Sequence, residues 1–145
     1  MRGPALKEKW HAPIRYVNLA DLKPWPGAAR THSKKQIRQI AESIRRFGFI
    51  NPIVIDEDWQ ILAGNGRVEA ARMMRLEEVP ALRIDTMSET EKRAYVIADN
   101  KTALNSRWDR RHLGEELERL LVEDLQFDVG ITGFSIIETV ELVGK

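Results

Sequence analysis

Cysteine is absent from this chain of 145 residues. Its absence excludes disulfides, thiolate zinc sites and cysteine nucleophiles. Long apolar runs are also absent, since no segment approaches the roughly 20 apolar residues that span a bilayer, and residues 1–13 lack the apolar stretch of a secretory signal. We therefore expect a cytoplasmic protein without a membrane partner.

The chain also lacks an excess of either charge. Lys and Arg number 23 against 22 Asp and Glu, which leaves a formal net charge of +1. Bulk charge therefore does not argue for nucleic acid, and a polyanion site must come from local clustering of basic residues. The length and the 43% hydrophobic content suit one domain with a modest core.

Hydrophobic spacing predicts an α+β fold with a small mixed β-sheet flanked by helices. The expected strands are 14–19, 52–55, 60–63 and 79–84, and the expected helices are 34–46, 67–74, 88–99, a long one after Asp109 and a short one after Gly133. Two prolines and a glycine within 21–30 predict an ordered loop there. Capping-box patterns open two of the helices, at Ser33 and Ser88. We expect a flexible arm at 1–13, a domain at 14–109 and a C-terminal helical extension at 110–145.

The segment Leu62-Ala-Gly-Asn-Gly-Arg-Val-Glu-Ala-Ala71 places Gly64 and Gly66 between a strand end and a helix start. Glycines allow several backbone N–H groups to face one phosphate, and the helix N-terminus adds partial positive charge. Arg67, expected in the exposed first turn of its helix, supplies a forked cationic donor. A tight packing turn is the alternative interpretation of the same glycines.

GNGRVEAA, preceded by GFINPIVID and followed by EEVPALRID, resembles the core of the ParB/sulfiredoxin superfamily. ARTHS at 29–33 and ADNK at 98–101 followed by Leu104 and Asn105 resemble two further motifs of ParB-like domains, especially those attached to DNA modification methyltransferases. The resemblance covers roughly residues 14–109. Sulfiredoxin itself is excluded, because its chemistry needs a cysteine in the glycine turn.

The resemblance implies a site for Mg²⁺ with a nucleoside triphosphate, CTP or ATP. Seven residues are expected to bind the nucleotide and its phosphates: Arg30, His32, Ser33, Gly64, Asn65, Gly66 and Arg67. Asp99 and Asn100 are expected to hold the metal ion, which suits a hard cation that takes one or two protein oxygens. Asn65 departs from the family pattern, which has histidine or glutamate there.

The expected function is nucleotide-dependent binding on or beside DNA, with the phosphate backbone contacted by Lys34, Lys35 and Arg38. One alternative is an enzyme, either a nuclease or a nucleotide hydrolase or kinase that acts through Glu69 or Asp99. Another is a protein-interaction module. Asp99 and Asn100 could each simply end their helix. The basic residues of helix 34–46 could simply form a solvated face. A second copy of the chain and a DNA methyltransferase remain open as partners.

Overall fold

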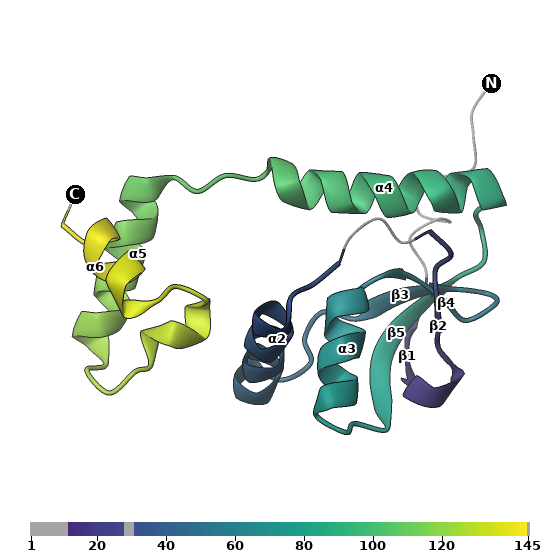
Figure 1. The fold of residues 1–145 in the computed structure, drawn as a ribbon, viewed down its shortest axis with the longest axis horizontal. Helices are drawn as coiled ribbons and strands as arrows, with labels where there is room; N and C mark the ends of the chain where they lie inside the picture. Colours follow the sequence, from purple (N-terminus) through teal and green to yellow (C-terminus); the bar gives the residue numbers. More distant parts are fainter. Residues whose placement is uncertain (1–11, 28–30, 145) are drawn as a thin grey trace. The chain divides into compact units, whose positions relative to one another are not determined.

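The structure, a computed structural model, describes residues 12–27 and 31–144 (Figure 1). Residues 1–11 of the expected arm and Arg30 lie outside the described residues. Packing divides the chain into two compact units, Met1–Leu104 and Asn105–Lys145. The first holds β1 (Ile14–Asn18), the short 3-10 helix η1 (Leu19–Asp21), β2 (Lys23–Pro24), α2 (Lys34–Phe47), β3 (Ile53–Asp56), β4 (Gln60–Ala63), α3 (Asn65–Met73), β5 (Glu78–Ile84) and α4 (Glu89–Asn105), whose last residue crosses the boundary.

The first unit is built on one five-stranded mixed sheet in the order β1-β5-β3-β4-β2. The β1–β5 and β3–β4 pairs are antiparallel, whereas β3–β5 and β2–β4 are parallel. This confirms the predicted α+β class. The loop expected over 21–30 differs, because Lys23 and Pro24 pair with Gln60 and Ile61. Proline is tolerated there since β2 lies at the sheet edge.

The central strands bury both faces, and alternate side chains serve different layers. Ile53, Ile55 and Ile61 join the core that includes Val68 and Ala71 of α3. Val54 and Leu62 point the other way, toward Trp25 and toward Tyr95 and Val96 of α4. In Figure 1, α2 and α3 lie side by side, and Ile37, Ala41 and Ala70 seal their contact. α3 and α4 therefore cover opposite faces of the sheet.

The capping boxes of α2 and α4 lie where predicted, but the end of α4 differs from the sequence-based expectation. The predicted capping box of α2 is confirmed, with Ser33 accepting from Gln36 N–H and Gln36 from Ser33 N–H. α4 begins after the second predicted box, at Ser88, but ends at Asn105 instead of near Asp99. Residues 100–105 contain neither glycine nor proline, so nothing in the backbone stops the helix.

The second unit contains α5 (Arg110–Glu123), η2 (Val129–Thr132) and α6 (Ile136–Leu142). The helix predicted after Asp109 is α5, which Asp109 caps by accepting from His112 N–H, and Ser135 opens α6 with a capping box. Leu117, Val129 and Leu142 form its core. Within the described parts of both units, no helix is long and apolar enough to cross a bilayer.

Gly114 lets α5 approach α6 closely, because a Cβ atom there would lie 2.3 Å from the carbonyl oxygen of Leu142. We expect Gly114→Ala to destabilise this unit by about 1–3 kcal/mol through overpacking, despite the better helix propensity of alanine. Hydrogen exchange should accelerate in α5 and α6 while β3–β5 keep their protection. Glu118→Ala, at an exposed position of α5, is the control. Equal exchange rates in both variants would contradict the interpretation that Gly114 is needed for close packing of α5 on α6.

Candidate functional site

The strand β4 turns into α3 at a single residue, Gly64, which adopts φ 101° and ψ 22°. A side chain would be strained at this φ, and a Cβ atom would lie 2.7 Å from Cγ2 of Ile53. The sequence predicted a turn over Gly64–Gly66 and a helix from Arg67. The helix begins two residues earlier, and its first bond runs from Val68 N–H to Gly64 O at 2.9 Å. A single residue in the left-handed conformation is therefore enough to connect β4 to α3.

Gly66 lies inside the first turn of α3 and has a different role. A Cβ atom at this position would lie 2.7 Å from Cδ2 and Nε2 of His32 and 2.9 Å from Cδ1 of Ile40. The missing side chain therefore lets the His32 imidazole lie against the helix backbone. This contact brings the residue before α2 to the N-terminus of α3.

The N-terminus of α3 has no side-chain cap, since Gly64 offers none. The first N–H groups of a helix lack partners within it and carry the positive end of its dipole. They border a cavity of about 490 Å³ within the first unit. Its polar lining comes from His32, Ser43, Asn51, Gly64, Asn65, Gly66, Arg67, Asp99 and Asn100. An open, uncapped helix N-terminus at a cavity is suited to an anion.

Arg67 is partly buried, not exposed as its first-turn position suggested. Its Nη2 donates to Pro52 O at 3.1 Å, because the segment entering β3 lies beside α3. Its Nε is buried without a hydrogen-bond partner. Burial lowers the pKa of the guanidinium from its ordinary value, and the negative charge of Asp99 acts in the opposite direction. Arg67 thus lines the cavity while making one structural contact and keeping one buried donor, Nε, without a partner.

The opposite wall of the cavity is formed by α4, which contributes Val96, Asp99, Asn100 and Ala103. The amide nitrogen of Asn100 donates to Val96 O at 2.9 Å, so the amide oxygen is its remaining ligand atom. Asp99 is exposed. Carboxylate and amide oxygens are ligands that Mg²⁺ accepts while keeping several waters. The two residues therefore fit a metal ion held jointly with phosphate oxygens.

The structure does not bring every expected site residue to this cavity. Glu69 is exposed and lines a separate cavity of about 370 Å³ with Lys34 and Arg38, while His32 lines both cavities. The Ser33 hydroxyl is used in capping α2. Lys35 is exposed on the same helix. Glu69 is therefore not placed to act on a group bound at the start of α3.

Sequence reasoning missed the apolar part of the larger cavity. It is lined by Ile40, Ile44, Phe47, Phe49, Ile50 and Leu62. The helical spacing of Ile40, Ile44 and Phe47 in α2 predicted core packing, yet Phe47 is 51% exposed. Ile50, which follows α2, is 70% exposed. Apolar side chains left this open beside an anion-compatible helix end produce an amphipathic cavity. Such a lining suits a ligand with one charged and one ring-like end.

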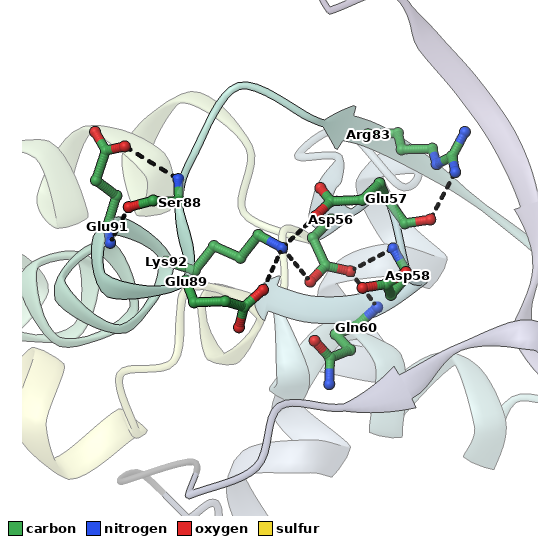
Figure 2. Close-up of polar contacts among 9 residues, drawn as sticks. All are labelled: Asp56, Glu57, Asp58, Gln60, Arg83, Ser88, Glu89, Glu91 and Lys92. Atoms are coloured by element: carbon green, nitrogen blue, oxygen red, sulfur yellow. Dashed lines mark hydrogen bonds and ion pairs between the residues drawn. The ribbon is translucent and has the colours of Figure 1, made fainter.

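A second polar constellation, unforeseen from the sequence, surrounds Lys92 of α4 (Figure 2). Its side chain is 1% exposed, and its ammonium lies 2.5 Å from Glu57, 3.0 Å from Glu89 and 3.2 Å from Asp56. Asp56 is fully buried and also accepts from the N–H groups of Asp58 and Gln60 at 2.9 and 2.8 Å. The sequence spacing could have indicated that Lys92 faces the sheet. Lys92 lies one helical turn before Val96 and two before Asn100, on the face of α4 that meets the sheet.

This cluster makes stability depend on pH. The hydrogen bond from Lys92 lowers the pKa of the Glu57 carboxyl from its ordinary value, and the same contact raises the pKa of Lys92. Glu57 therefore stabilises the fold above the usual pKa of glutamate, and this contribution is lost as the pH falls through its lower folded value. The Lys92 contribution is complete below the usual pKa of lysine and is lost only in strong alkali.

We expect Glu57→Gln to flatten the acid limb of the unfolding free energy between about pH 5 and pH 3, where wild type loses stability as Glu57 takes up a proton. Urea unfolding at a series of pH values measures this slope. Glu78→Gln removes an exposed carboxylate that is not among the Lys92 partners and is the matched control. Parallel acid limbs for wild type and Glu57→Gln would show that this pair carries no pH dependence.

The fold and cavity define a small α+β domain with an anion-compatible helix N-terminus. The chain belongs to the ParB N-terminal domain family, whose model matches residues 5–101. It is 43% identical over 79 residues to the ParB-like nuclease domain-containing protein YnaK of Escherichia coli K12, which covers 54% of this chain and 91% of that protein. A probable chromosome-partitioning protein ParB of Rickettsia bellii is 27% identical over 88 residues, 60% of this chain and 30% of that protein.

Solved structures support the same fold. The C-terminally truncated chromosome-partitioning protein ParB from Caulobacter crescentus, complexed with CTP-gamma-S, matches with a TM-score of 0.75 at 21% identity. The match covers 90% of this chain and 76% of that one. The Pnob8-like ParB-N domain matches with a TM-score of 0.54 at 17% identity, over 78% of this chain and 48% of that one. Identities this low establish the fold alone.

Proposed function

We propose that this chain binds a nucleoside triphosphate with Mg²⁺ in the larger cavity and acts on or beside DNA. The observation that carries the proposal is the uncapped start of α3, with Arg67 beside it, at the edge of an amphipathic cavity. Asp99 and Asn100 line the same cavity from α4. A polyphosphate, a metal ion and the ring faces of a nucleobase each have a matching part of the lining.

The charges explain why metal and nucleotide belong together. Phosphate oxygens accept from the backbone N–H groups of the first turn of α3 and from Arg67, and they complement the helix dipole. Asp99 would repel a bare triphosphate, whereas a divalent cation between them turns the repulsion into attraction. We infer that the Mg²⁺ complex binds more tightly than the free nucleotide.

The apolar side chains of the cavity offer contact area for the base and ribose, consistent with either CTP or ATP. The Caulobacter crescentus ParB that shares this fold is complexed with CTP-gamma-S, which favours testing CTP first. Calorimetric titration with CTP, ATP and GTP, each with and without Mg²⁺, tests the proposal directly. Absence of binding for all three would reject it and favour a protein-interaction module.

We expect Arg67→Ala to weaken binding of the Mg²⁺–nucleotide by roughly a hundredfold or more. Two charge-assisted hydrogen bonds are lost, each worth about 1.5–3 kcal/mol, and every 1.4 kcal/mol is about tenfold in affinity. The melting temperature should also fall modestly, since the bond to Pro52 O is lost. Calorimetry below the melting transition separates the two effects.

Arg72→Ala is the matched control for this experiment. Arg72 lies on the same helix and also donates to a backbone oxygen, that of Leu19 at 3.2 Å, but does not line the larger cavity. It should lower stability and leave nucleotide affinity unchanged. Equal affinities of the two variants would remove Arg67 from the site.

DNA association rests on the basic residues at the start of α2. Lys34, Lys35 and Arg38 are exposed, and each phosphate neutralised by a cation adds to the salt dependence of binding. Among proteins of this fold, a Caulobacter crescentus ParB is complexed to the centromeric parS site. Backbone contact by α2 would be independent of sequence, as expected for phosphate recognition.

We expect Lys35→Glu with Arg38→Glu to weaken binding to all DNA sequences alike and to reduce the slope of log affinity against log salt by about two. Fluorescence anisotropy with two unrelated duplexes measures both quantities. Arg15→Glu with Lys23→Glu makes the same charge change at exposed positions of the edge strands β1 and β2. If both double variants lose affinity equally, net charge and not α2 governs the association.

A nuclease is the main competing function, and the name of YnaK keeps it in view. Asp56, Glu57 and Asp58 form the one group of three or more acidic, His or Cys side chains close enough to share a metal ion among residues 12–27 and 31–144. Asp56 is fully buried, and its carboxylate is paired with the buried ammonium of Lys92. Asp58 is exposed, but DNA does not reach the Asp56 carboxylate, and Glu57 is paired with Lys92, which favours the binding function. Mg²⁺-dependent cleavage of DNA by the wild-type chain would reverse this preference.

A further inference from the structure

α4 packs on the face of the sheet to which Leu62 of β4 contributes, and residues of α4 and the residues after β4 line the same cavity. At one end, Lys92 contacts Asp56 before the turn into β4. In the middle, Val96 and Leu62 share an apolar cluster. At the other end, Asp99 and Asn100 line the cavity together with the residues that follow β4. About 1.5 Å per helical residue and about 3.3 Å per strand residue make these two paths similar in length.

The attachment of α4 is narrow. Of the α4 side chains that the structure describes, Lys92 and Val96 alone are buried. Val96 makes an apolar contact, which tolerates sliding along the strand because dispersion is not directional. Lys92 makes directional contacts with carboxylates on two elements, Glu89 of α4 and the pair Asp56 and Glu57 at the β3–β4 turn.

A buried ammonium holds its partners in a defined geometry. Displacing α4 by a fraction of a turn would keep the pair with Glu89, which moves with the helix, but would leave the fully buried Asp56 carboxylate without its counter-charge. An unpaired buried charge costs much more than loss of a surface pair. Asp56 itself cannot follow, because it also accepts from the N–H groups of Asp58 and Gln60. Figure 2 shows these contacts converging on the turn.

We propose that Lys92 is a positioning residue for the nucleotide site. It fixes the position of α4 along the sheet, and with it the position of Asp99 and Asn100 relative to the start of α3. The inference rests on the proposed function for its link to nucleotide binding. Lys92 contacts no ligand itself. The β3–β4 turn thus sets the positions of both sides of the site. Gly64 follows it at the far end of β4, and the proposed metal-binding pair lies two turns along α4 from Lys92.

The first test measures the position of α4 without any nucleotide. The chain has no cysteine, so Met73→Cys on α3 and Ala98→Cys on α4, both exposed, accept nitroxide labels without competing thiols. We expect Lys92→Met to broaden or shift the inter-label distance distribution measured by pulsed electron paramagnetic resonance. Lys92→Arg, which keeps a cation, should retain the narrow wild-type distribution. An unchanged distribution in Lys92→Met overturns the proposal.

The second test measures binding below the melting transition, with CTP as the first probe. Lys92→Met should lower affinity for Mg²⁺–CTP by about tenfold, as loss of a supporting residue does at a metal site, and leave the weaker Mg²⁺-free binding unchanged. Lys92→Arg should restore the Mg²⁺ effect. A purely structural role would lower the melting temperature and leave both affinities alone, which would also overturn the proposal.

If Lys92→Met does not fold, Lys92→Met with Asp56→Asn takes its place, because the amide oxygen still accepts from the turn and no buried carboxylate is left unpaired. The two tests also separate failure of this inference from failure of the proposed function. Wild type that binds no CTP, ATP or GTP rejects the proposed function, and the label distances then decide the positioning role alone. If wild type and Lys92→Met bind Mg²⁺–CTP equally, only the positioning role is rejected.

Discussion

The site depends on one close contact, the approach of the Gly64 backbone to Ile53. The left-handed conformation of this residue turns β4 into α3 without a loop, and the absence of a side chain allows the turn to rest on the neighbouring strand. Because β4 passes directly into α3 through Gly64, which has no side chain, the first N–H groups of α3 stay uncapped at the end of β4. Every other feature of the cavity is arranged around this bare helix end.

The electrostatics of the cavity are balanced across its two walls. The α3 side is positive, through the helix N-terminus and Arg67, and the α4 side is negative, through Asp99. Their mutual attraction is limited by the space between them, which is wide enough for a ligand. A ligand that carries both signs, such as a metal-bound polyphosphate, satisfies both walls at once. A simple anion satisfies one wall and meets repulsion from the other.

Local signals in the sequence were sufficient for most elements of the fold. The β3 and β4 runs, the Ser33 capping box and the glycine turn all rest on short-range chemistry, and each lies where predicted within a residue or two. Non-local contacts were not predictable. Burial of Arg67 needs Pro52, which lies 15 residues earlier, and the Lys92–Glu57 pair joins residues 35 apart. Periodicity places a residue on a face, but only the assembled sheet decides what that face meets.

Total charge averages over two units of opposite sign. Residues 1–104 hold 18 Lys and Arg against 13 Asp and Glu, whereas residues 105–145 hold 5 against 9. The near-neutral sum therefore hides a basic unit that carries the cavity and α2. Polyanion binding gains from counterion release only where cations displace counterions, and an acidic unit has the opposite tendency. The charge distribution therefore favours the first unit for the proposed nucleotide and DNA contacts, and the acidic second unit is less suited to contact phosphate.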